Sequence, residues 1–117
     1  MTFELPQDEH APAVARAALG GFAHSLDDER FDATRLLVSE LVTNAVKYGG
    51  DGPVRLEVAT DPGRFRAEVI DSGSGFEMTE RRGEQVGGWG LPLVEHLADR
   101  WGTFQGSTHV WFELDLQ

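Results

Sequence analysis

The alternation of apolar and polar residues is clearest in the middle of the chain. Apolar side chains occupy every second position of VRLEVAT (54–60) and RFRAEVI (64–70), and the turn sequence DPG lies between them. This period of two predicts a hairpin of half-buried strands. Shorter runs predict strands at TFEL (2–5), WGTFQ (101–105) and HVWFELDL (109–116). The inward-facing side chains of the last strand are expected to be Val110, Phe112, Leu114 and Leu116.

A helical period predicts three further elements. The longest helix is expected from Asp28 to about Tyr48, where YGGDGP supplies a stop and a turn. Its core face would carry Val38, Leu41, Val42, Ala45 and Tyr48. An earlier helix should begin soon after Pro6, and LPLVEHLADR (91–100) should form a short third one. The apolar face of the first helix is expected to consist of Ala13, Val14, Ala17, Ala18 and Phe22.

The resulting order is β-α-α-β-β-loop-α-β-β, with residues 77–86 as the loop because they show no period. Most strands are hairpin neighbours, which favours an α+β two-layer sandwich over alternating βαβ units. A length of 117 residues with 40% hydrophobic content corresponds to one ordinary domain. We therefore expect a single domain over residues 1–117 that carries the whole function.

Charge and composition narrow the classes of partner. Ten basic and twenty acidic residues give a formal net charge of −10, which disfavours nucleic acid and suits a basic protein partner. The chain contains no cysteine, which excludes disulfides and thiolate chemistry. It also has no apolar run of the length that crosses a bilayer, and its first residues lack the pattern of a leader. These features predict a soluble, cytoplasmic protein without membrane contact.

The long helix contains an unusual pair of polar residues. Glu40 and Asn44 are four residues apart, so they stack one turn apart at the border of its apolar face. The amide oxygen of an asparagine can ligate a hard cation, and the carboxylate of a glutamate can accept a proton. The alternative is an ordinary solvated pair on a helix surface.

Two glycine clusters follow in the second half of the chain. In DSGSGF (71–76) a strand-end aspartate precedes glycines that permit close backbone approach, which fits a flat ring with an exocyclic amine. GGWGL (87–91) precedes the last helix, where free amides favour an anion such as phosphate. A plain turn and a flexible helix entry are the alternatives.

Other nucleotide and metal motifs are absent from the sequence. There is no P-loop, and Lys47 is the only lysine, so the lysine-bearing site of ordinary protein kinases cannot form either. The histidines His10, His24, His96 and His109 show no paired metal-ligand spacing. Any metal is therefore expected to bind together with a nucleotide.

Three segments follow one another along the chain, namely SELVTNAVKYGG (39–50), VIDSGSGF (69–76) and GGWGLPLV (87–94). In order, they resemble the asparagine box and the two glycine boxes of a known ATP-binding fold, which gyrase, Hsp90 chaperones, histidine kinases and mismatch-repair proteins share. The resemblance extends from about residue 30 to the closing GSTHVWFELDL (106–116). Within that superfamily, the chain resembles the anti-sigma-factor serine kinases and their actinobacterial relatives. The implied fold is a mixed, largely antiparallel sheet with helices on one face.

The resemblance also implies roles for individual residues. Glu40 corresponds to the general base, Asn44 to the magnesium ligand, and Asp71 to the residue that binds the adenine amino group. The other implied nucleotide-site residues are Gly73 and Gly75 beside the adenine, Gly88, Gly90 and Leu91 beside the phosphates, and Thr108, which supports the aspartate. Residues 77–86 would be a lid, with Arg81 and Arg82 either near the γ-phosphate or solvated.

The implied function is that of a serine/threonine kinase that uses ATP and Mg²⁺. It would phosphorylate an anti-sigma-factor antagonist, sequester a sigma factor and be able to pair as a homodimer. Two alternatives remain: a non-catalytic module in which ATP only shapes a protein-binding surface, and the catalytic half of a split histidine kinase. Glu40 favours the kinase over the inert module.

Overall fold

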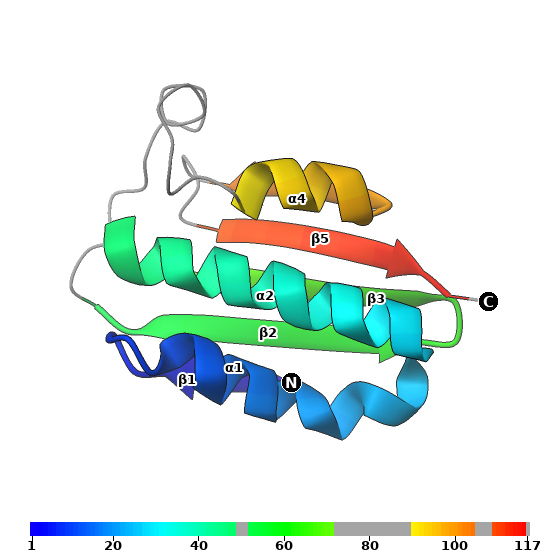
Figure 1. Cartoon of the computed structure of the whole chain (residues 1–117), viewed down its shortest axis with the longest axis horizontal. Helices are drawn as coiled ribbons and strands as arrows, with labels where there is room; N and C mark the ends of the chain where they lie inside the picture. The colour runs from blue at the N-terminus through cyan, green and yellow to red at the C-terminus, as the bar shows by residue number, and fades with distance from the viewer. Residues whose placement is uncertain (49–51, 72–89, 105–108, 117) are drawn as a thin grey trace.

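A computed structural model describes residues 1–48, 52–71, 90–104 and 109–116. Three α-helices, a 3₁₀ helix and five strands lie in these ranges (Figure 1). In chain order they are β1 (Thr2–Leu5), α1 (Ala11–Leu19), η1 (Gly20–Ser25), α2 (Asp28–Tyr48), β2 (Val54–Asp61), β3 (Arg64–Ile70), α4 (Gly90–Leu97), β4 (Arg100–Phe104) and β5 (His109–Asp115).

The five strands form one sheet in the order β1-β2-β3-β5-β4. The register of the central hairpin pairs Leu56 with Val69 and Val58 with Ala67. On the other side of β3, Ala67 pairs with Phe112 of β5. All four strand pairings among the described residues are antiparallel, whereas the family resemblance implied a mixed, largely antiparallel sheet. The predicted α+β fold class is confirmed.

The helices cover one face of the sheet, so the core lies between the two layers (Figure 1). Alternate side chains of each strand point into this core, as Phe65 and Ala67 of β3 and Phe112 of β5 show with no exposed surface. From α2, Leu37, Val38 and Val42 are equally buried. This helix is packed against β2 and β3, and both α1 and α4 pack against it in turn.

The helix α2 begins and ends where the sequence predicts. Asp27 caps its start, because Asp27 Oδ1 accepts a hydrogen bond from the backbone N–H of Arg30 at 2.8 Å. That bond is the main reason that the pKa of Asp27 lies below its usual value. The predicted core residues Val38, Leu41, Val42 and Ala45 are buried, while the Tyr48 side chain lies outside the described residues.

The predicted face of the first helix is wrong. Ala11, Ala15 and Leu19 are the buried residues of α1, whereas Ala13 and Ala17 are exposed and Val14 is 40% exposed. The helix also begins at Ala11, because Asp8 first forms a turn in which its carboxylate accepts the N–H of His10 at 2.8 Å. Phe22 belongs to η1 and packs edge-to-face on Phe65, with 6.2 Å between ring centroids.

The last helix is shorter than predicted. The helix α4 ends at Leu97 rather than near Arg100, because the N–H of Asp99 already donates to the Glu113 carbonyl oxygen of β5 at 2.9 Å. Arg100 therefore starts β4. In β5, Val110, Phe112 and Leu114 are buried as predicted, and Leu116 is half-buried beyond the end of the strand. The predicted lid, residues 77–86, lies outside the described residues.

The opposite face of the sheet carries a network of charged side chains. Glu113 accepts hydrogen bonds from Arg100 Nε at 2.9 Å and Arg66 Nη1 at 3.2 Å. The Arg100 bond is the main reason that the pKa of Glu113 lies below its usual value. Arg66 also lies 4.5 Å from the centroid of the Trp111 ring. This network braces β3, β4 and β5 on the face that the helices leave open.

No helix in the part of the chain that the structure describes is both long and apolar enough to span a bilayer.

Candidate nucleotide site

Three elements that carry predicted site residues, α2, β3 and α4, are packed together through α2. In Figure 1, α2 ends on the left and α4 runs in the opposite direction along it, and α2 contacts both β3 and α4. The antiparallel course of α2 and α4 produces this arrangement, because the end of one helix then lies beside the start of the other. Along the chain, the end of β3 at Ile70 lies between the end of α2 at Tyr48 and the start of α4 at Gly90.

Glu40 and Asn44 lie in the last three turns of α2, separated along the axis by about 6 Å, which is the rise of four helical residues. The two side chains differ in their surroundings. Asn44 is 7% exposed, whereas Glu40 is half-buried. Neither side chain makes a hydrogen bond or ion pair with another of the described residues. Asn44 thus has little exposed surface and carries a carboxamide that forms no hydrogen bond within the described fold.

Asp71 directly follows β3 and is 6% exposed. It is the only buried residue with an ionisable side chain in the described part of the chain. A carboxylate at a buried strand end is costly unless it accepts hydrogen bonds, so its presence needs a polar partner. Asp71 does have a polar or electrostatic interaction in the structure, so its burial is compatible with a nucleotide site and with a plain turn.

Gly90 is the first residue of α4, and Leu91 lies in its first turn. Backbone N–H groups in the first turn of a helix lack intrahelical partners, so the described part of the second glycine cluster has donors that the helix itself does not use. The other glycines of the predicted site, Gly73, Gly75 and Gly88, lie outside the described residues. The same is true of Thr108, Arg81 and Arg82.

These groups fit a magnesium nucleotide by their chemistry. Asn44 offers an amide oxygen, which is a ligand that Mg²⁺ accepts alongside phosphate oxygens and water. Asp71 offers an acceptor for an amine hydrogen, and the start of α4 offers N–H donors to an anion. Glu40, more accessible than Asn44, can exchange a proton with a molecule at the surface.

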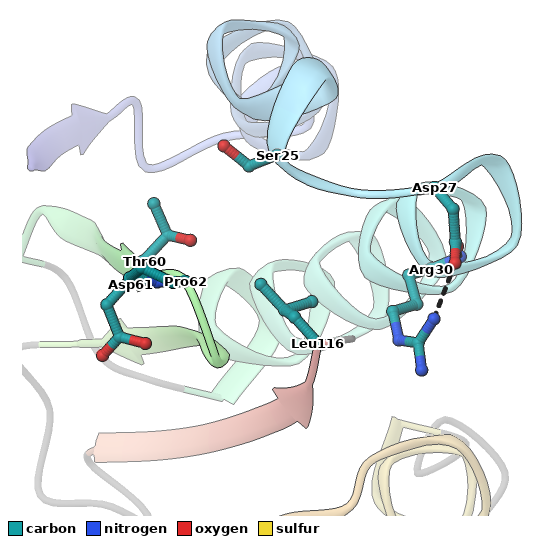
Figure 2. A pocket seen from close by; sticks show the side chains of 7 residues that line it. All are labelled: Ser25, Asp27, Arg30, Thr60, Asp61, Pro62 and Leu116. Carbon is teal, nitrogen blue, oxygen red and sulfur yellow. Dashed lines mark hydrogen bonds and ion pairs between the residues drawn. The ribbon is translucent and has the colours of Figure 1, made fainter.

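A separate hollow of about 450 Å³ lies at the opposite end of α2 (Figure 2). Its lining comes from the start of α2, the β2–β3 turn and the residue after β5, as Arg30, Pro62 and Leu116 illustrate. Arg30 is already engaged there, with Nη1 2.6 Å from Asp27 Oδ2 and Nε 2.8 Å from the Asp115 carbonyl oxygen. This hollow is therefore distinct from the site predicted around Asn44.

The sequence did not predict an exposed apolar side chain next to Glu40. Leu36 is 44% exposed, one turn before Glu40 on α2. It lines an open groove between α2 and α4. The available signal was an apolar residue on the polar side of an amphipathic helix, at a spacing of four from the predicted base.

Comparison with known proteins places the chain in a family. Residues 5–113 match the family described as the Histidine kinase-like ATPase domain. The chain is 27% identical over 118 residues to the serine-protein kinase RsbW of Listeria monocytogenes serotype 4a (strain HCC23), and the match covers 85% of this chain and 75% of that protein. The RsbW of Listeria innocua serovar 6a (strain ATCC BAA-680 / CLIP 11262) matches with the same identity and coverage.

A second kind of relative has a different name. The anti-sigma F factor of Clostridium acetobutylicum is 30% identical over 101 residues, which cover 74% of this chain and 71% of that protein. These matches confirm the resemblance inferred from the three sequence boxes. The chain belongs to the Histidine kinase-like ATPase domain family.

Proposed function

We propose that this protein is an ATP-dependent serine/threonine kinase that regulates transcription through protein partners. It would phosphorylate a serine or threonine of a small antagonist protein and sequester a sigma factor. The names of the relatives, serine-protein kinase and anti-sigma F factor, support this function. The observation that carries it in this chain is the position of Asn44, a residue with 7% exposure, one helical turn from the half-buried Glu40.

In this proposal, Asp71 accepts a hydrogen bond from the adenine amino group and so selects adenine over guanine. Asn44 supplies an oxygen ligand to the cation. Magnesium, when bound, neutralises charge on the β- and γ-phosphates. Gly73, Gly75, Gly88, Gly90, Leu91 and Thr108 would complete the nucleotide site.

Glu40 is the proposed general base. As the acceptor hydroxyl oxygen forms its bond to the γ-phosphorus, the hydroxyl proton passes to the Glu40 carboxylate. The bond between the γ-phosphorus and the β,γ-bridging oxygen breaks, and ADP leaves. Catalysis then depends on the placement of the reactants and on charge neutralisation.

Titration calorimetry tests the nucleotide part of the proposal. The wild-type chain should bind ATP and ADP with Mg²⁺ present and should bind GTP at least about tenfold more weakly, because guanine offers Asp71 a carbonyl in place of a donor. Equal affinities for ATP and GTP would show that Asp71 does not select adenine.

Light scattering at high micromolar concentration, with and without Mg-ATP, tests the proposed homodimer, and a monomer in both conditions would exclude it.

A further inference from the structure

The groove between α2 and α4 combines an apolar floor with an acidic rim. Its floor consists of Ala33 and Leu36 from α2, Leu97 from α4 and Leu114 from β5. Its volume is about 440 Å³, which is within the range of sites that bind ligands or partner side chains. We call this surface the α2–α4 groove.

Leu36 is the most informative residue of the floor. It is 44% exposed, and the only other large apolar side chains exposed to this degree among the described residues are Met1 and Val14. Leu97 is half-buried and Leu114 is 3% exposed, so Leu36 extends an apolar surface that begins in the core. Burial of such a side chain against a partner would be favourable, because it removes apolar surface from water.

The rim carries the charge. Glu29, Asp32 and Asp99 are exposed around the floor. Glu29 has no ion pair with any described residue, and Asp32 reaches Arg35 only at 3.7 Å. Arg30, the single basic residue of the lining, is engaged by Asp27 at 2.6 Å. The rim therefore has an excess of negative charge, as does the whole chain with its formal charge of −10.

Helix stability explains part of this pattern but not all of it. Acidic residues in a first turn stabilise a helix through its dipole, which accounts for Asp28 and Glu29 at the start of α2. It does not account for Asp99, which follows α4, or for the exposure of Leu36. Asp99 is also held in place, because its Oδ2 accepts the N–H of Asp115 at 2.7 Å.

We infer that the α2–α4 groove is a docking site for a basic, amphipathic helical segment of a protein partner. One apolar side chain of that segment would enter between Leu36 and Leu97, and its lysine or arginine residues would face Glu29, Asp32 and Asp99. Charge complementarity selects this occupant, because a basic segment is attracted where an acidic one is repelled. The floor lacks the convergent polar groups of a small-molecule site, and a helix laid in an apolar groove is a common mode of peptide recognition.

The groove is continuous with the proposed catalytic residue. Glu29, Ala33, Leu36 and Glu40 follow one another at spacings of four, three and four on α2, so they share one face of the helix. A segment in the groove would thus lie within one helical turn of Glu40. Docking itself does not require phosphate transfer, so this inference stands apart from the kinase proposal.

The test uses a ¹⁵N-labelled full chain and two synthetic 14-residue peptides with leucines at helical spacing. One peptide carries lysine at its remaining positions, and the other carries glutamate. The lysine peptide should shift the amide signals of Ala33, Leu36 and Leu97, and it should bind at least about tenfold more tightly than the glutamate peptide. Equal binding of the two peptides, or shifts confined to another surface, would overturn the inference.

Matched variants distinguish peptide binding in the groove from nonspecific attraction of a basic peptide to an acidic protein. Leu36→Gln should weaken binding of the lysine peptide about fivefold or more, whereas Val14→Gln, which changes a similarly exposed residue on α1, should stay within about twofold. Glu29→Lys should weaken binding more than the charge-matched Glu9→Lys. Equal effects within either pair would contradict the inference. Melting temperature and Mg-ATP affinity, measured on the same variants, show whether the fold and nucleotide site are intact.

Two other occupants are decided by the same variants. If light scattering shows a dimer that Leu36→Gln converts to a monomer, the groove is an interface between two copies of this chain and the inference fails. If the wild-type chain binds anionic lipid vesicles and Leu36→Gln abolishes that binding, the occupant is a membrane surface and the inference fails likewise.

Discussion

Asn44 lies one helical turn beyond Glu40 on α2, and it is 7% exposed where Glu40 is half-buried. This difference in burial suits the two side chains of one helix to two different roles, ligand binding and proton transfer. A buried carboxamide can hold a ligand that stays bound throughout a reaction, whereas an accessible carboxylate can meet a hydroxyl group that arrives with another molecule.

Replacement of Asp71 should lower nucleotide affinity, and a thermal melt separates this effect from any loss of stability. Asp71→Asn replaces a charged acceptor by a neutral amide with one acceptor oxygen, so the hydrogen bond from the adenine amine is weakened and ATP affinity should fall at least about tenfold. Calorimetry with ATP and a thermal melt of the free protein measure the two effects. Full ATP affinity in the variant would show that Asp71 does not bind the adenine.

The buried Thr34 hydroxyl should be dispensable for stability. Thr34 is fully buried on α2, and its Oγ1 has no hydrogen-bond partner among the described residues. Thr34→Val keeps the shape and removes this unpaired group, so the free energy of unfolding should rise by about 1 kcal/mol. Urea denaturation measures this change. The control is Thr43→Val, which loses a 2.8 Å bond from Oγ1 to the Ser39 carbonyl oxygen and should not stabilise the protein.

Two glycine replacements should have opposite effects. A Cβ atom at Gly102 would lie 2.8 Å from Cζ2 of Trp111, and Arg66 covers that ring. Gly102→Ala should therefore lower the free energy of unfolding by about 1–3 kcal/mol. Gly20 has helical dihedrals and no atom within 4 Å of the added Cβ, so Gly20→Ala should raise the free energy of unfolding by about 0.4–1 kcal/mol. Similar effects of the two replacements would contradict the described packing of Trp111.

The charged side chains on the open face of the sheet should make the free energy of unfolding depend on pH. Hydrogen bonds from Arg100 and then Arg66 hold the pKa of Glu113 below its usual value in the folded chain. A lowered folded-state pKa adds stability that is complete above the unfolded value of about 4.3 and is lost as pH falls through the folded value. Glu113→Gln should therefore be less stable than wild type at pH 7, and the difference should shrink below about pH 4. A difference that stays constant in urea melts from pH 7 to pH 3 would contradict this role.

The sequence predicted most of the fold because its strongest patterns coincide with its longest elements. The bounds of α2 and β3 agree with their expected ranges, since turn residues flank a clear period in both cases. The face of α1 could not be predicted in the same way. Alanine occupies both its buried positions, such as Ala15, and its exposed positions, such as Ala17, so the apolar pattern offers no contrast.

The candidate site was predictable in its residue types but not in its surroundings. The spacing of Glu40 and Asn44 indicated a shared edge of α2, but only the packing of that helix shows that Asn44 is almost fully buried. The end of α4 at Leu97 and the groove beside Leu36 depend on contacts with β5 and between helices. Such contacts join residues far apart in the chain, so the local spacing of apolar residues does not predict them.

The most direct test of the proposed kinase is phosphate transfer measured on Glu40 and Asn44 variants beside wild type. The assay uses ATP labelled on the γ-phosphate and a protein partner recovered from the native cell with Mg-ATP present, and calorimetry and thermal melts accompany it. Glu40→Ala should keep Mg-ATP affinity within a few-fold and lose about 10²-fold or more in transfer rate, because a general base acts mainly when the hydroxyl attacks. Asn44→Ala should lose magnesium-dependent affinity, because the cation loses a protein oxygen ligand. Wild-type protein that binds Mg-ATP but transfers no phosphate to any such partner, or Glu40→Ala that transfers phosphate at the wild-type rate, would contradict the account.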